Sequence, residues 1–336
     1  MINELTRYGA ITAKVRTMYA RRIRDEDWAA MASMQSVVEV GKYLADHPGW
    51  HDAFATLPAG ILHRGQLETA LRQQLIREFV KLYQFAGPED KRFLLYHVRK
   101  AEYEITLHRL RTLLSGTTGE PTVPSEFLLR KIALDFAALS QAGSWREILA
   151  AVTDTIFHKH LLRVDVSLST GLPDYTAVSV LLQGIYYASL HKFVLQTYRG
   201  AMQQIFLASL GQEIDLLNLI HIMRLKKYFP KSPQLSEDML FPVFYKLRPD
   251  FFRALIATPD YAGALYLLQD SSYGKFFSTY NFAYIDQYYA RRIYDFNRKQ
   301  LASGKPTPYV SAAYLSLKEA EMRRLFGVIE TAHYRS

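Results

Sequence analysis

The chain has 336 residues, of which 49% are hydrophobic and 22% charged, a composition typical of a folded globular protein and not of a disordered one. It contains no cysteine, which excludes disulfide scaffolds, thiolate metal sites, iron–sulfur clusters and a cysteine nucleophile. Its formal net charge of +9 favours an anionic partner: a nucleic acid, a lipid surface or an acidic protein.

The sequence shows no targeting or membrane-spanning segment. The N-terminal residues lack the apolar region of a signal peptide. The longest apolar run, 177–190, is shorter than the roughly 20 helical residues that cross a bilayer. We therefore expect a soluble chain.

Helical periodicity dominates the chain. Apolar residues recur at spacings of three and four over 66–85, the pattern of an amphipathic helix. A second helix is expected over 88–114, because it opens with a proline and two acids and ends at a Ser-Gly cap signal. Further helices are expected over 124–143 and over 174–228, with a weak point near Gly200. No convincing strand pair or hairpin signal is found, so the sequence predicts an all-α fold.

A weak repeat runs through these helices. Glu102 and Asp215 lie 113 residues apart, and each is followed by a histidine at i+6 and an arginine at i+9, namely Arg111 and Arg224. Glu321 lies 106 residues beyond Asp215, and both are followed by a leucine at i+4. The spacing predicts three related helical bundles within one continuous domain. We place them at 1–116, 117–230 and 231–336.

Signatures of catalysis and cofactor binding are missing. The chain has neither of the glycine-rich motifs that cradle nucleotide phosphates, and no HExxH or GxSxG motif. Its histidines are scattered; His158 and His160 are two residues apart, which points them to different faces of a helix, whereas a helical metal pair uses i and i+4. We therefore predict no catalytic residue, no cofactor and no metal, and no binding of ATP.

The segment 214–228 is apolar nearly all round and is expected to be a buried helix. Asp215, Asn218, His221 and Arg224 advance along it in steps of three, as a polar stripe. Because an unpaired buried charge is strongly unfavourable, Asp215 and Arg224 are expected to be buried and paired with helix ends or opposite charges. An all-α enzyme with an acid site around Asp215 and His221 stays open as an alternative.

Aromatic and basic residues are interleaved near both ends of the chain. Ten aromatic residues lie in 273–296 together with Arg291 and Arg292, and Arg21 and Arg22 follow a tyrosine near the N-terminus. Such clusters can stack nucleic-acid bases, although at helical spacing they more often make core and interface contacts. We expect the four arginines at the surface, as candidate partner contacts. A basic helical nucleic-acid-binding protein is therefore a second alternative.

The segment 211–226 (GQEIDLLNLIHIMRLK) closely resembles the signature helix of the C/d family of V-type (A/V-type) ATPase subunits. The stretch 8–50 is similar to that family's opening, and 319–325 is similar to its last motif. The similarity covers essentially the whole chain in order. Its most specific positions are Asp215, Asn218, Arg224 and Lys226.

The resemblance implies a funnel of three pseudo-repeated helical bundles, which agrees with the repeat. We count Glu102 and Arg111 from the repeat, and Glu321 from the resemblance, among the structural motif residues. It also implies a non-catalytic rotor subunit on the cytoplasmic face of the membrane, attached only through its complex. Its partners would be the central-shaft subunits and the membrane rotor ring of proteolipid subunits, with no nucleic acid. Through them it would couple ATP turnover to proton or sodium transport.

Overall fold

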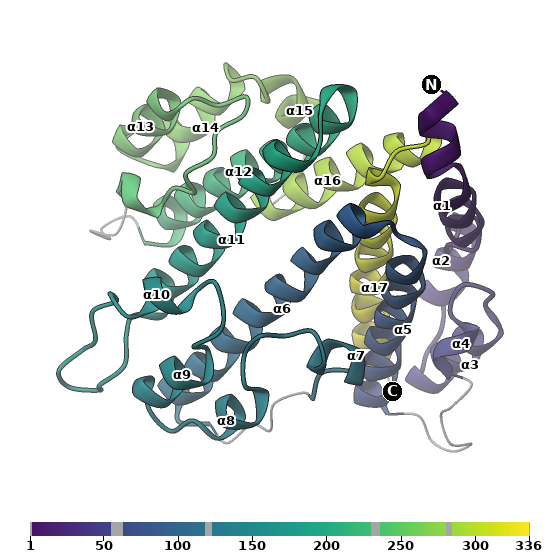
Figure 1. Cartoon of the computed structure of the whole chain (residues 1–336), viewed down its shortest axis with the longest axis horizontal. Coiled ribbons are helices and arrows are strands. Elements are labelled where there is room, and N and C mark those ends of the chain that lie inside the picture. Colours follow the sequence, from purple (N-terminus) through teal and green to yellow (C-terminus); the bar gives the residue numbers. More distant parts are fainter. Residues whose placement is uncertain (1, 55–62, 118–122, 230–235, 280–283, 336) are drawn as a thin grey trace. The chain divides into compact units, whose positions relative to one another are not determined.

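The computed structural model of the chain describes residues 2–54, 63–117, 123–229, 236–279 and 284–335 (Figure 1). In these ranges every named element is a helix, and the only β contact is an isolated antiparallel bridge between Val166 and Pro173. The predicted all-α class is therefore confirmed. The helices divide into two compact units, Met1–Lys91 with Tyr294–Ser336, and Arg92–Ile293.

The first unit joins the two ends of the chain. It contains α1 (Ile2–Ala20), α2 (Asp25–Ala32), α3 (Val37–Asp46), α4 (His51–Phe54), α5 (Arg64–Phe85), the start of α6 (Pro88–Ser115), the end of α16 (Ile285–Ala302) and α17 (Tyr309–Arg335). The C-terminal helix α17 packs against α1, α3 and α5 (Figure 1). One apolar cluster combines Trp50 and Leu44 from the N-terminal part with Leu325 and Ile329 of α17. The N-terminal and C-terminal segments thus share one core.

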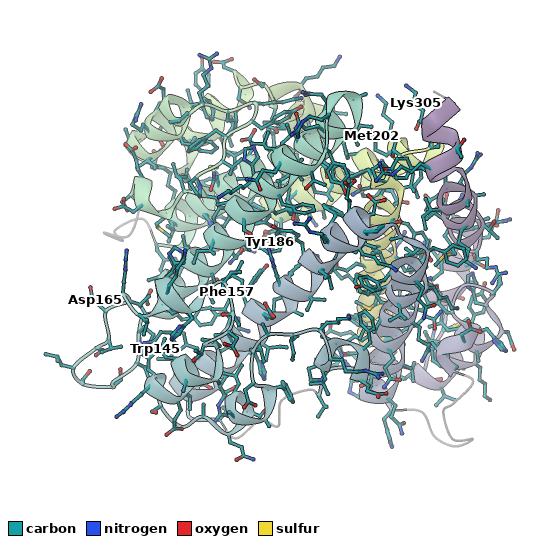
Figure 2. All side chains as sticks on the ribbon, viewed as in Figure 1. Trp145, Phe157, Asp165, Tyr186, Met202 and Lys305 are labelled. Carbon is teal, nitrogen blue, oxygen red and sulfur yellow. The ribbon has the colours of Figure 1, made fainter. Side chains whose placement is uncertain are left out.

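The second unit is built around the long helices α11 and α12. It contains the rest of α6, α7 (Glu126–Leu129), α8 (Phe136–Gln141), α9 (Trp145–Ala151), α10 (His158–Leu161), α11 (Tyr175–Thr197), α12 (Gly200–Tyr228), a 3-10 turn (Glu237–Met239), α13 (Pro249–Ala257), α14 (Tyr261–Gln269), α15 (Gly274–Thr279) and the start of α16. Trp145, Phe157 and Tyr186, which Figure 2 labels, are buried in it. A further cluster packs α12 against α13 and α14, with Phe252 and Leu268 at its centre.

Most predicted helices are present, and their ends follow local chemistry. The helix predicted over 66–85 is α5, and the one predicted over 88–114 is α6, which ends where Gly116 takes a φ of +63°. The weak point near Gly200 separates α11 from α12, and Gly200 also has a positive φ, of +56°. A left-handed backbone of this kind favours glycine.

The single helix predicted over 124–143 is wrong, because the structure has the two short helices α7 and α8 there. Two hydrogen bonds stabilise the break, one local and one from another helix. The Asp135 side chain accepts a hydrogen bond from the Ala138 N–H and so starts α8 as its N-cap, while the Ala133 N–H is taken by a side chain of another helix, Glu102. Competing hydrogen bonds thus replace the continuous helix.

The helices α11 and α12 are each long and apolar enough to span a membrane by length and composition. The apolar stretch of α12 is 61% buried inside the protein, and that of α11 is 33% buried. The two helices also pack against each other. Core helices of folded proteins give the same signal, so this finding is weak evidence for insertion into a membrane.

Candidate functional site

Asp215 is fully buried in the middle of α12. Its carboxylate accepts hydrogen bonds from the backbone N–H groups of Tyr245, Lys246 and Leu247 at 3.1, 2.8 and 3.2 Å, and from the Tyr273 hydroxyl at 3.1 Å. Burial raises the pKa of Asp215, and these hydrogen bonds oppose the rise. The expectation that Asp215 is buried and paired is therefore confirmed.

Two further polar residues of α12 hold the following segment in the same way. Asn218 is fully buried; its amide oxygen accepts the Phe241 N–H at 2.8 Å and its amide nitrogen donates to the Phe241 carbonyl at 3.4 Å. Lys226 is buried, and its ammonium donates to the carbonyls of Ile256, at 3.0 Å, and Thr258. Thr258 is the C-cap of α13, so Lys226 neutralises the end of that helix.

Arg224 does not follow the expectation of burial, which is wrong for this residue. Its side chain is 54% exposed and forms a 2.9 Å ion pair with Asp286, itself 46% exposed. The reason is that Arg224 lies on the outer face of α12, whereas Met223 and Lys226 on either side of it in sequence are buried. An exposed pair of this kind contributes little to stability.

His221 is mostly buried against the ring of Phe241, with 5.2 Å between ring centroids. Burial, with a smaller contribution from the Arg224 charge, lowers the pKa of His221 to about 4. Its Nδ1 atom has no hydrogen-bond partner in the described part of the chain. His221 and Asp215 therefore do not form a hydrogen-bonded acid–base pair through that atom.

Glu102 of α6 lies in the second unit, as Asp215 does, and occupies the equivalent position of the weak sequence repeat. It is 4% exposed and accepts the Ala133 N–H at 2.6 Å, and burial raises its pKa. Arg111, further along the same helix, is exposed; it donates to the Tyr175 hydroxyl and its guanidinium lies 4.9 Å from the Tyr175 ring centroid.

Glu321 of α17 makes the same kind of contact in the first unit. One oxygen accepts the Ile23 N–H at 2.9 Å, and the other accepts the Trp50 indole N–H at 2.8 Å. Lys318 donates to Glu321 at 2.9 Å and to the Gly49 carbonyl at 3.1 Å, and its ammonium lies 3.6 Å from the Trp50 ring centroid. This network ties the C-terminal helix to the N-terminal segment.

The three acids share one arrangement. Each sits on a long helix and binds backbone N–H groups a few residues before a short helix: α8 for Glu102, α13 for Asp215 and α2 for Glu321. A base later on the same long helix then donates to carbonyls at the end of that short helix. These pairs are Arg109 with Ala142, Lys226 with Thr258, and Arg335 with Ala32.

The similarity continues through the next two short helices. The second short helices are α9, α14 and α3. Each begins with an N-cap side chain that accepts the backbone N–H three residues on: Ser144, Asp260 and Ser36. The third short helices are α10, α15 and α4. A buried aromatic residue directly precedes each of them: Phe157, Tyr273 and Trp50. Tyr273 and Trp50 donate to their acids, whereas phenylalanine has no side-chain donor to offer Glu102.

Sequence reasoning found the acids but missed the bases Arg109 and Arg335 and the aromatic donors. Arg109, Lys226 and Arg335 lie 7, 11 and 14 positions after their acids. Each base therefore lies on the same helix face as its acid, which could have indicated a shared role. The aromatic donors carry no local signal, because their partners are distant in sequence; Trp50 and Glu321 are 271 residues apart.

The four arginines proposed as partner contacts divide into two pairs. Arg21 and Arg22 are exposed, as expected, and Arg22 lies over the Tyr19 ring. Arg291 and Arg292 are half-buried, so their expected exposure is wrong. Arg292 of α16 donates to Gln212 of α12 at 2.7 Å and lies over the Phe276 ring. This part of α16 therefore packs against other residues of the second unit. Of the ten aromatic residues, Tyr280 and Phe282 lie outside the described residues.

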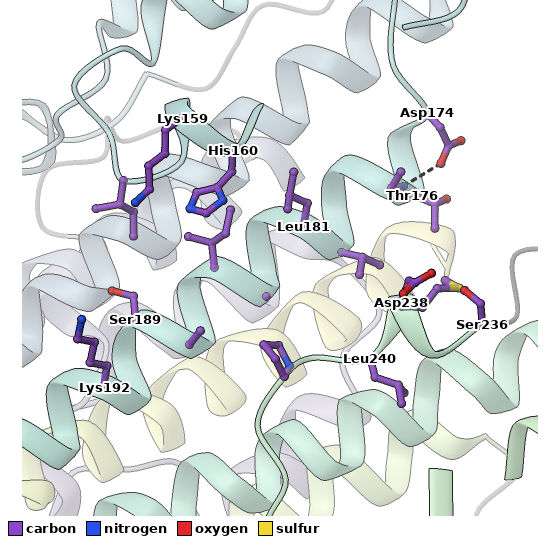
Figure 3. A pocket seen from close by; sticks show the side chains of 18 residues that line it. Lys159, His160, Asp174, Thr176, Leu181, Ser189, Lys192, Ser236, Asp238 and Leu240 are labelled. Atoms are coloured by element: carbon purple, nitrogen blue, oxygen red, sulfur yellow. Dashed lines mark hydrogen bonds between the residues drawn. The ribbon is translucent and has the colours of Figure 1, made fainter. Parts of the chain in front are cut away.

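An open groove of about 920 Å³ runs along α11 in the second unit (Figure 3). Its walls come from α10, α11 and residues 236–242. Most of the lining is apolar, including Leu181, Ile185 and Leu240. No group of three or more potential metal ligands occurs in the residues that the structure describes.

A family model for the ATP synthase (C/AC39) subunit matches residues 11–336. The chain belongs to the ATP synthase (C/AC39) subunit family. The match confirms the resemblance seen in the sequence and covers the three acids of this C/AC39 family member, their bases and the groove. A search of curated proteins found no match.

Proposed function

We propose that the chain is a non-catalytic subunit that links the central shaft of a V-type ATPase or ATP synthase to the membrane rotor ring. In this role it couples ATP turnover to proton or sodium transport from the cytoplasmic face, as a peripheral part of the complex. The observation that carries the proposal is the family match over residues 11–336. The physical requirements of such a part are rigidity and two binding surfaces.

Rigidity is supported by the anchoring of short helices onto long ones. At Asp215 alone, one fully buried carboxylate holds three consecutive backbone N–H groups and a tyrosine hydroxyl. Hydrogen bonds to a charged group are roughly twice as strong as neutral ones. A subunit that transmits torque needs contacts of this kind, because a loosely packed subunit would deform and would not pass the rotation on.

The three anchors also support a repeat. In the proposed repeats 1–116, 117–230 and 231–336, three short helices that share the arrangement above are followed by a pair of long helices. In addition, α1 precedes them in the first repeat, α7 in the second and the 3-10 turn in the third. The acid of each repeat binds backbone N–H groups just ahead of a short helix of the next: Glu102 before α8, Asp215 before α13, and Glu321 before α2 of the first repeat. These contacts support a repeated arrangement of short helices against long ones.

The nucleic-acid alternative has less support. Arg291 and Arg292, which lie among the aromatic residues that could stack bases, are half-buried. The family match names an ATP synthase subunit.

Affinity purification tests the linking role. A tagged chain isolated in mild detergent from cells that express the whole complex should carry shaft and proteolipid subunits in fixed stoichiometry. Recovery of the chain alone, or with nucleic acid that salt removes, would contradict the proposal.

A further inference from the structure

We propose that the groove along α11 is the docking site for one amphipathic α-helix of another subunit, oriented antiparallel to α11. The inference deepens the proposed linking role and rests on it only for the statement that the partner is a subunit of the complex. It is argued from the shape, lining and charge of the groove itself.

The floor of the groove has the pattern of an unpaired helix seam. Ala177, Leu181, Gly184 and Ala188 line the groove at spacings of four, three and four, the spacing at which one helix meets another side by side. Small residues at three of these positions allow close approach. The seam spans about three turns, since 1.5 Å per residue gives roughly 17 Å from Ala177 to Ala188.

The two ends of the groove carry opposite charge (Figure 3). Lys159 and Lys192 stand at the end near the C-terminus of α11, both exposed and without an ion pair in the described part of the chain. Asp174 and Asp238 stand at the other end, near the start of α11. The lining between these ends is mainly apolar. The groove therefore complements a ligand with an apolar face, an acidic end and a basic end.

A helix satisfies this pattern better than an amphiphile with one headgroup. The tail of a fatty acid bound to the lysines would end against two carboxylates, which disfavours it. Helices commonly carry acids in the first turn and bases in the last, in keeping with their dipole. Such a helix places its N-terminal turn against Lys192 and its C-terminal turn against Asp174, and this fixes the antiparallel direction.

The experiment uses the full-length chain, whose lack of cysteine allows one label. Thr176→Cys at the groove rim carries an environment-sensitive dye. The probes are helical peptides of about 18 residues, long enough to cover the seam at 1.5 Å per residue, with one leucine stripe and either acidic and basic ends, two acidic ends or two basic ends. We expect a saturable dye response to the acidic–basic peptide, with binding at least tenfold weaker for the other two.

Three variants make the test specific. Lys159→Glu combined with Lys192→Glu should transfer the preference to the peptide with two basic ends. Gly184→Leu should weaken binding at least tenfold by filling the groove, because a Cβ at Gly184 meets only Phe241 and Pro242, at ordinary contact distances of 3.8 and 3.9 Å. Leu195→Asp, on the same helix at an exposed site outside the groove, is the matched control and should change nothing.

Equal binding of all three peptides, no binding, or equal loss in the Leu195 variant would overturn the proposal. So would a fluorescent fatty acid that competes out the peptide and binds more tightly. Circular dichroism of each variant separates loss of binding from loss of folding. If the peptides do not bind but the chain still co-purifies with shaft and ring subunits, the groove is not a docking site and the linking role is retained.

Discussion

The Tyr273 hydroxyl donates a 3.1 Å hydrogen bond to the Asp215 carboxylate, and neither side chain is more than 1% exposed. The two residues are 58 positions apart, so this bond ties the start of α15 to the middle of α12. It is the fourth hydrogen bond to a carboxylate that already binds three backbone N–H groups. Burial and the adjacent charge of Asp215 both raise the pKa of Tyr273, so the hydroxyl keeps its proton and remains a donor.

Replacing the buried acid should destabilise the fold strongly. Asp215→Ala leaves its backbone partners without an acceptor, and breaking a buried charged contact costs about 3–5 kcal/mol in the free energy of unfolding. Asp165→Ala, at an exposed acid, is the matched control and should cost less than about 0.5 kcal/mol. Urea denaturation measures both. An unchanged midpoint for Asp215→Ala would show that its motif does not support the architecture.

Removing only the tyrosine donor should have a smaller effect. Tyr273→Phe keeps the buried ring and deletes one hydrogen bond to a charged group, so the free energy of unfolding should fall by about 1.5–3 kcal/mol. Tyr266→Phe is the control, because Tyr266 is 71% exposed. Equal denaturation curves for the two variants would mean that the Tyr273–Asp215 bond contributes no stability.

Arg224 and Lys226 lie two positions apart on α12 and should behave differently. Arg224→Ala breaks an exposed ion pair and should cost under about 1 kcal/mol. Lys226→Met leaves the carbonyls of Ile256 and Thr258 without their buried donor and should cost about 1–3 kcal/mol. Thermal unfolding of both variants checks the order, and the reverse order would contradict the burial described here.

Arg224 and Lys226 show which structural features can be predicted from the sequence and which cannot. Periodicity and capping signals were enough to place α5 and α6 and the break at Gly200, because those features depend on neighbouring residues. They were also enough to predict a buried, paired Asp215. The exposure of Arg224 and the bond between Trp50 and Glu321 depend on which distant segments pack together, and no local pattern encodes that.

Stability should decrease in acid because of His221. Its pKa is about 4 in the folded chain against an ordinary value of 6.5, so between these values the unfolded chain binds a proton that the folded chain does not. The contribution of neutral His221 to the free energy of unfolding is therefore fully present above about pH 6.5 and is lost as the pH falls toward 4, by up to about 3 kcal/mol at 1.36 kcal/mol per pKa unit. His221→Phe should flatten this part of the curve.

Urea denaturation of the wild-type chain and the His221→Phe variant at several pH values measures the difference. The gap between the two free energies of unfolding should change steadily from about pH 6.5 to about pH 4, in favour of the variant. A gap that is constant over this range would show that His221 does not titrate differently on folding.

The most direct test of the linking role is the number of ions transported per ATP hydrolysed by the complex, reconstituted in vesicles with and without this subunit. With the subunit, transport should accompany hydrolysis at a fixed ratio. Without it, the catalytic head should still hydrolyse ATP while transport falls to background, because nothing joins shaft to ring. Unchanged transport per ATP in its absence would contradict the account.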